Sequence, residues 1–120
     1  QVVVTGHSLA ASRAEALPPA WTAAARFEQP VLAIRALDSD AWGRVWLAVA
    51  TFVEQDDGTV IDEHLEVLRF GPDGKLQGRQ PATLEAGPEE QMRTFSVGLD
   101  GSLWHLARQE DGAVIERWAP

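Results

Sequence analysis

The residues that could carry chemistry in this chain are few and widely separated. The three histidines, His7, His64 and His105, stand in neither the H-x-H nor the H-E-x-x-H spacing that would direct two imidazoles at one metal ion. The absence of cysteine excludes disulfides, thiolate catalysis and iron–sulfur clusters. No G-x-S-x-G turn presents a serine, and no G-x-x-x-x-G-K or G-x-G-x-x-G loop could cradle a phosphate. We therefore expect no cofactor and no catalytic residue.

The nearest approach to a metal site is the run Asp38-Ser39-Asp40-Ala41-Trp42-Gly43, which begins like the D-x-D-x-x-G loop of calcium-binding proteins. Such a loop needs an oxygen ligand at its fifth position and a bidentate glutamate at its twelfth. Those positions hold Trp42 and Val49 here. Asp38 and Asp40 are thus metal candidates by spacing alone. A solvated turn is the preferred interpretation, and we expect no metal.

Five tryptophans are the remaining candidates for recognition. Trp46 and Trp104 stand inside apolar runs and are expected in the core. Trp21, Trp42 and Trp118 stand near the ends of expected elements, where an exposed ring could stack on a sugar or on a partner protein. These three are the candidate ligand-binding residues.

Length and charge limit the class of protein. A chain of 120 residues is one domain by length, and 45% hydrophobic with 23% charged residues is an ordinary globular composition. The net charge of −8 is the wrong sign for a nucleic-acid or anionic-membrane binder, and no apolar run reaches the 18 or so residues of a membrane span. Because the chain begins at Gln1 rather than Met, an extracytoplasmic or cell-envelope location is favoured.

The first 30 residues predict a strand followed by a helical segment. Val2, Val3 and Val4 are β-branched and indicate a short strand. Ser8 is a suitable N-cap for an alanine-rich helix over 9–17, which the Pro18-Pro19 pair ends. The same proline pair could open a second short helix over 20–28.

From residue 31 onward the pattern changes to that of β-strands. The run 44–53 is apolar on both faces, which predicts a central strand covered on both sides. Asp-Gly pairs between β-rich runs indicate hairpins, whereas 81–91 is predicted to be a loop. The predicted strands are 31–37, 44–53, 65–70, 94–99, 102–107 and 113–118. The expected fold class is mainly β, an antiparallel meander over a first repeat (31–80) and a second repeat (92–118).

Two stretches of this β region are similar to each other. Gln55-Asp56-Asp57-Gly58 matches Gln109-Glu110-Asp111-Gly112, Val45-Trp46 matches Leu103-Trp104, and Arg69-Phe70 matches Arg117-Trp118. The inferred insertions between the copies are of even length, which keeps side chains on the same face of a strand.

The repeated unit, Asp100-Gly101-Ser102-Leu103-Trp104-His105-Leu106-Ala107 with Arg69-Phe70-Gly71-Pro72-Asp73-Gly74-Lys75, resembles the blades of β-propeller repeat proteins over about residues 31–118. Propellers use four to eight blades, and this chain holds about two. Either several copies complete a ring, or the chain is a fragment, or a single curved sheet is covered by the N-terminal helix. The last arrangement is slightly favoured.

The function expected from these features is a non-catalytic protein-interaction or structural module, in an envelope or secreted assembly. One alternative is carbohydrate or small-ligand binding through tryptophan and acidic side chains, and another is a hydrolase with an unrecognised site. A protein partner is expected, and a monomer or weak dimer is favoured over a ring of copies. An exposed tryptophan pair would favour the ligand alternative. A buried carboxylate beside a histidine in a cleft would favour the hydrolase.

Overall fold

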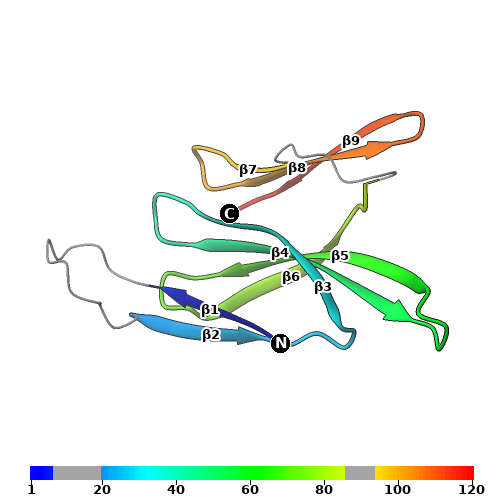
Figure 1. Cartoon of the computed structure of the whole chain (residues 1–120). Coiled ribbons are helices and arrows are strands. Elements are labelled where there is room, and N and C mark those ends of the chain that lie inside the picture. Colours follow the sequence, from blue (N-terminus) through cyan, green and yellow to red (C-terminus); the bar gives the residue numbers. More distant parts are fainter. Residues whose placement is uncertain (7–19, 86–93) are drawn as a thin grey trace, which may run out of the picture.

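The computed structural model describes residues 1–6, 20–85 and 94–120, which form nine strands in three antiparallel sheets (Figure 1). The N-terminal sheet pairs β1 (Val2–Gly6) with β2 (Trp21–Ala25). The central sheet has the order β3 (Val31–Ser39), β4 (Val45–Glu54), β5 (Val60–Phe70), β6 (Leu76–Ala82). The C-terminal sheet has the order β7 (Phe95–Val97), β8 (Leu103–Gln109), β9 (Gly112–Trp118). The mainly β, antiparallel fold class is confirmed.

The helix predicted over 20–28 is wrong. Residues 21–25 form β2, which pairs with β1 from Val2 opposite Ala25 to Gly6 opposite Trp21. A helix this short is marginal on its own, so the tertiary pairing outweighs the helix propensity of its alanines. As a strand, the segment turns alternate residues toward the central sheet, where Ala25 is fully buried. The helix predicted over 9–17 lies outside the described residues.

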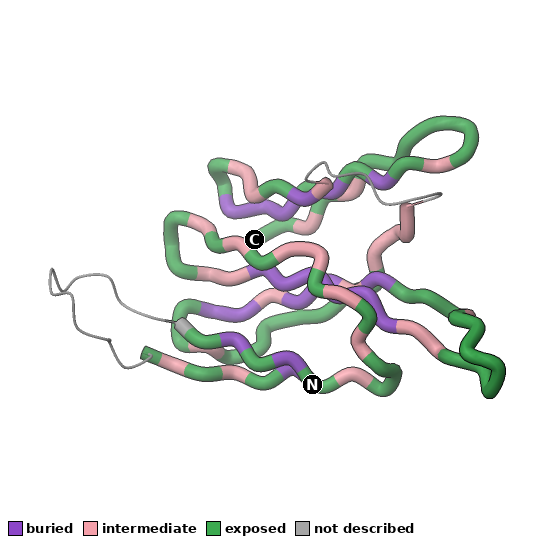
Figure 2. Tube along the Cα trace, in the orientation of Figure 1, coloured by how far each residue is buried: buried purple, intermediate pink, exposed green. Residues whose placement is uncertain are grey.

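The prediction of a central strand over 44–53 is confirmed. β4 pairs with β3 on one side and β5 on the other, and its residues from Trp46 to Thr51 are buried. Figure 2 shows buried residues concentrated in β4 and the adjoining half of β5, with smaller groups in β1 and β8. Since a β-strand directs successive side chains to opposite faces, this strand supplies two separate cores.

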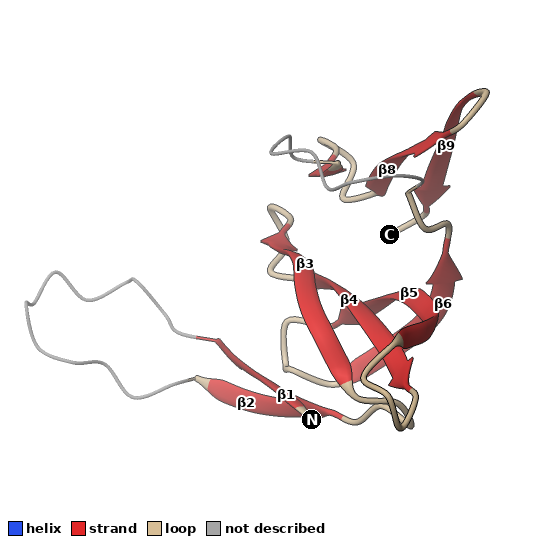
Figure 3. Cartoon of the chain, turned by 45° about the vertical axis from the view of Figure 1, so that its right-hand side comes forward, coloured by secondary structure: helices blue, strands red, loops and turns tan. Residues whose placement is uncertain are grey.

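The three sheets follow one another in chain order (Figure 3). The two cores join them. One face of β4, with Leu47 and Val49, packs against Val2 and Val4 of the N-terminal sheet. The other face, with Trp46, Ala48 and Ala50, packs against Phe95 and Leu103 of the C-terminal sheet. The single curved sheet with a helical cover, slightly favoured from the sequence, is therefore not what forms.

Four of the hairpin turns share one geometry. In each, a glycine with positive φ donates its N–H to the carbonyl oxygen three residues earlier; the four glycines are Gly43, Gly58, Gly74 and Gly101, with φ from +81° to +86°. Left-handed backbone is costly for residues with a Cβ, so glycine is the residue that closes these turns. The Asp-Gly turns predicted at Gly58, Gly74 and Gly101 are thus confirmed as hairpin turns.

The outer strand β6 has no counterpart among the predicted strands, and its last two residues fall within the predicted loop over 81–91. Its sequence, LQGRQPA, contains a glycine and a proline, and all but its last residue are exposed. Proline is tolerated on an edge strand because one side of that strand needs no ladder hydrogen bonds. No helix within 1–6, 20–85 and 94–120 is long and apolar enough to cross a membrane.

Candidate interaction site

The contact between the central and C-terminal sheets is built on one tryptophan. Trp46 is 4% exposed, and its indole N–H donates to the carbonyl oxygen of Gly101, over 3.0 Å, in the β7–β8 turn. On the same face of the central sheet, Arg69 lies opposite Trp46 on β5 and holds its guanidinium carbon 5.7 Å from the centre of the indole ring. The indole is therefore stacked, hydrogen-bonded and covered by the next sheet.

The C-terminal sheet contains a second pair with the same geometry. Trp104 on β8 lies opposite Arg117 on β9, and that guanidinium carbon is 5.6 Å from the ring centre. Both tryptophans stand on the face turned away from the preceding sheet in the chain. Trp104, however, is 42% exposed, so the prediction that it lies in the core is wrong. The reason is that no further sheet covers this face within the described part of the chain.

The uncovered surface of the C-terminal sheet is called the open face below. Pairing places Leu106 opposite Ile115 on the same side as Trp104 and Arg117, and Leu106 and Ile115 are 49% and 70% exposed. Arg117 also donates to Asp100 over 2.8 Å. Hydrogen bonds to Asp100 from Ser102 and then from Arg117 lower its pKa to about 2. The open face is therefore an apolar strip with one Arg–Asp pair beside it.

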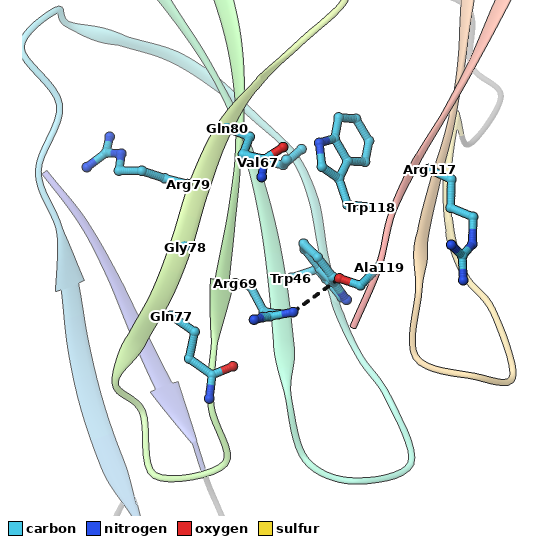
Figure 4. Close-up of a pocket in the computed structure, with 10 residues that line it drawn as sticks. All are labelled: Trp46, Val67, Arg69, Gln77, Gly78, Arg79, Gln80, Arg117, Trp118 and Ala119. Carbon is cyan, nitrogen blue, oxygen red and sulfur yellow. Dashed lines mark hydrogen bonds between the residues drawn. The ribbon is translucent and has the colours of Figure 1, made fainter.

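A hollow of about 280 Å³ lies between β6 and the C-terminal end of β9, bordered by Trp46 and Trp118 (Figure 4). The other residues that line it are Val67, Arg69, Gln77, Gly78, Arg79, Gln80, Arg117 and Ala119. In Figure 4 the guanidinium groups of Arg79 and Arg117 point away from the two indoles. Arg79 forms an ion pair with Glu66, and Arg117 forms one with Asp100. Arg69 alone stays beside Trp46 and donates to the carbonyl oxygen of Ala119 over 3.1 Å.

A second polar constellation surrounds His105, on the covered face of β8. The imidazole is completely buried and stacks on Phe95 with ring centres 4.0 Å apart. Its Nδ1 lies 3.0 Å from Glu116 and its Nε2 lies 2.9 Å from Glu85. Each ring nitrogen therefore lies within hydrogen-bond distance of one glutamate. This arrangement fastens the segment after β6 to the C-terminal sheet.

The electrostatics of the two glutamates agree with that role. Burial raises the pKa of Glu116, but hydrogen bonds from the backbone of Thr83 and from His105 outweigh it and leave the pKa below its usual value. Burial likewise raises the pKa of Glu85, and hydrogen bonds from His105 and Thr94 reverse the shift. Both carboxylates are thus held ionised beside an imidazole that has no free nitrogen and no solvent access.

The structure does not bring the three candidate tryptophans together. Trp21, the first residue of β2, packs against the core between the N-terminal and central sheets, with its ring against Gly74. Trp42, 58% exposed, stands on the β3–β4 turn below the guanidinium of Arg44, 5.2 Å from it. Trp118 is half-buried at the end of β9. Of the three, Trp118 alone borders the hollow.

Asp38 and Asp40 each accept hydrogen bonds from residues that follow them in the chain. Asp40 accepts hydrogen bonds from the backbone N–H groups of Trp42 and Arg44 and from the Arg44 side chain. Burial raises the pKa of Asp40, but these hydrogen bonds lower it to a net value below the usual one. Asp38 accepts from the N–H of Ser39 over 2.9 Å. Within the described ranges, no group of three His, Asp or Glu residues is placed to hold a metal ion.

The sequence-based prediction missed the Arg69–Trp46 pair, the hollow and the buried His105. The match of Arg69 with Arg117 and of Trp46 with Trp104 in the repeat contained the signal for the paired geometry. Nothing comparable was available for the hollow, because it depends on β6, whose exposed sequence has no strand pattern.

The fold and the site together define a stack of small antiparallel sheets joined by tryptophan. Comparison of the chain with protein-family models, with curated proteins and with solved structures found no match.

Proposed function

We propose that this chain is a non-catalytic protein-interaction or structural module whose repeated sheets stack in the manner of propeller blades, and that it acts through the open face. The observation that carries the proposal is the pair of equivalent tryptophans. Trp46 and Trp104 have the same Arg partner geometry, 5.7 and 5.6 Å, yet Trp46 is covered by a sheet and Trp104 is not. The Trp46 face of the central sheet packs against the C-terminal sheet. The open face has the same Trp–Arg geometry and is therefore suited to pack against a further sheet.

The composition of the open face supports this function. Tryptophan and arginine are enriched where proteins contact each other, and exposed apolar side chains that lie together mark binding surfaces. Trp104, Leu106 and Ile115 supply such a strip, and the Arg117–Asp100 pair borders it. A second β-sheet would remove this strip from water, as the C-terminal sheet does for Trp46.

The two alternatives have less support. Sugar binding through a tryptophan pair with acidic side chains would need exposed indoles together, whereas Trp21, Trp42 and Trp118 are apart and no acid lines the hollow. The hydrolase would need a histidine and a carboxylate in a cleft. His105 has its carboxylates but is completely buried, and both ring nitrogens are engaged.

Sedimentation velocity over a wide concentration range tests the proposal. The purified chain offers its own sheets as partners, so we expect a monomer of 13.1 kDa that self-associates weakly at high concentration. Trp104→Ser combined with Leu106→Ser should abolish the association, while Leu99→Ser, at an exposed residue of the β7–β8 turn, should not. A strictly monomeric wild type, or association that the double variant leaves intact, would contradict the proposal. A closed ring of copies would favour the full propeller arrangement.

A further inference from the structure

The central and C-terminal sheets differ by one strand. The order β3-β4-β5-β6 has four members, whereas β7-β8-β9 has three. In the repeat, 65–70 of β5 corresponds to 113–118 of β9, since Arg69 matches Arg117 and Phe70 matches Trp118. β5 uses this segment to pair with β6, from Leu65 opposite Ala82 to Phe70 opposite Leu76. The outer edge of β9 has no strand against it among the described residues.

The hollow lies beside that unpaired edge. Its floor is β6, with Gly78 and Gln80 opposite Arg69 and Val67, and its wall is the end of β9 with Trp118. These β6 positions share the face that Trp46 and Val67 turn toward the C-terminal sheet, but that sheet does not extend far enough to cover them. A fourth strand on β9 would lie over β6 and fill this space.

The charges that line the hollow indicate which side chains a fourth strand on β9 would carry. Three arginines and no acidic residue line it, in a chain of net charge −8. Arg79 and Arg117 already have carboxylate partners. Arg69 has none within the described ranges, and its Nε is buried without a hydrogen-bond partner there. A carboxylate that reached Arg69 would form a charge-assisted hydrogen bond in a partly dry site.

We propose that the β9 edge and the adjoining hollow form an acceptor site for one extended strand of a partner polypeptide, running antiparallel to β9. Main-chain hydrogen bonds to β9 supply the affinity, as in other cases of strand addition. Apolar side chains of the strand pack on Trp118 and Trp46, and one acidic side chain pairs with Arg69. This inference deepens the proposed function, because the added strand would also widen the open face.

The test is an NMR titration of the isotope-labelled full chain with a peptide of about eight residues. In this peptide, valine and threonine alternate around a central glutamate. We expect shifts at β9 amides and at the Trp118 indole. A peptide with proline at its centre should bind at least tenfold more weakly, because it lacks a ladder N–H and resists pairing. Replacing the peptide glutamate with glutamine should also cost about tenfold, the order of one charged hydrogen bond.

Variants of the chain locate the site. Gly78→Leu is the blocking variant, since a Cβ at Gly78 meets no atom within 4 Å and Gly78 lines the hollow, where the leucine side chain should occupy the space. It should abolish peptide binding with an unchanged thermal midpoint, and Leu76→Val on the same strand is its control. Arg69→Gln should remove the preference for the glutamate peptide over the glutamine peptide.

The outcomes separate this proposal from the proposed function. Trp104→Ser with Leu106→Ser should leave peptide binding unchanged, and Gly78→Leu should leave self-association by the open face unchanged. The acceptor site would be overturned if β9 amide resonances did not shift at millimolar peptide. It would also be overturned if neither Gly78→Leu nor the proline in the peptide weakened binding. Self-association that Gly78→Leu abolishes would assign the hollow to a second copy of the chain and would overturn it equally.

Discussion

Trp46 and Gly101 are 55 residues apart in the sequence, and a single hydrogen bond of 3.0 Å joins the indole of the first to the carbonyl oxygen of the second. The bond connects a central strand to the turn of the next sheet, at a place where the indole is already packed and almost fully buried. The hydrogen bond therefore fixes where the β7–β8 turn of the C-terminal sheet packs along strand β4. The Trp104 indole occupies the equivalent place one sheet later, where no further sheet covers it within the described residues.

Truncation of Trp46 should destabilise the protein severely. Trp46→Ala leaves a cavity between the sheets and removes the hydrogen bond to Gly101, for an expected loss of about 3–5 kcal/mol in the free energy of unfolding. Trp46→Phe keeps most of the packing and should cost about 1–2 kcal/mol, mainly because the Gly101 carbonyl loses its donor. Denaturant unfolding followed by circular dichroism measures both.

The control is Trp104→Ala, at the equivalent but exposed position, which should cost less than about 1 kcal/mol. Equal losses at the two positions would show that both tryptophans have the same environment in solution. A loss below about 1 kcal/mol for Trp46→Ala would show that β4 is not sandwiched.

Gly74 and Gly58 provide a matched pair of turn glycines. Both have positive φ, +81° and +85°, so alanine at either position should cost about 1–2 kcal/mol in backbone strain. A Cβ at Gly74 would also approach the Trp21 ring to 2.7 Å, whereas at Gly58 its nearest contact is Glu54 at 3.8 Å. Gly74→Ala should therefore be the more destabilising by about 1–3 kcal/mol, and Trp21→Leu should remove most of the difference. Thermal and denaturant unfolding of the two glycine variants, alone and each combined with Trp21→Leu, measures this.

How far the fold followed from the sequence depended on whether local and tertiary preferences agreed. The run at 44–53 is apolar on both faces, and the Asp-Gly pairs at Gly58 and Gly101 demand left-handed backbone, so strand and turns were predicted at the right places. At 20–28 the two preferences disagree. Alanine favours a helix locally, but pairing with β1 and burial of Ala25 stabilise a strand. The local sequence pattern cannot predict this pairing, because β1 lies about 20 residues away in the chain.

The candidate site followed from the sequence in part. The repeat aligned Trp46 with Trp104 and Arg69 with Arg117, which share their stacked geometry in the structure. The solvent exposure of the two tryptophans could not be derived from the repeat, because it depends on whether another sheet covers that face. Trp104 was therefore expected in the core, and the hollow beside Trp118 was not foreseen.

Removal of the His105 side chain should show whether it serves as a structural fastener. His105→Phe keeps a ring on Phe95 but leaves Glu85 and Glu116 without their shared hydrogen-bond partner, so we expect a loss of about 2–4 kcal/mol in the free energy of unfolding. Native-state hydrogen exchange should rise in β7 and β8 more than in β4. A variant as stable as the wild type would show that the two glutamates find solvent or other partners.

The decrease in the free energy of unfolding at low pH should depend on the same two glutamates. Burial raises the pKa of Glu85 and Glu116, but hydrogen bonds from His105, Thr83 and Thr94 lower it further, to net values below the ordinary 4.5. A depressed folded pKa means that the unfolded chain binds protons first, so the stabilisation is complete above about pH 4.5 and is lost as the pH falls through the folded values. We expect the free energy of unfolding, measured by denaturant titration, to decline in that window.

The paired variant Glu85→Gln with Glu116→Gln isolates the effect. It should be less stable than the wild type at pH 7, and its free energy of unfolding should decline less steeply below pH 4.5, so that the two curves converge in acid. Asp100→Asn is the control at a different site. The pKa of Asp100 is lowered from 3.8 to about 2, so its contribution should persist to lower pH and fade between those two values. Curves for the glutamine variant and the wild type that stay parallel down to pH 2 would show that these carboxylates titrate alike in the folded and unfolded chains, and that His105 does not hold them ionised.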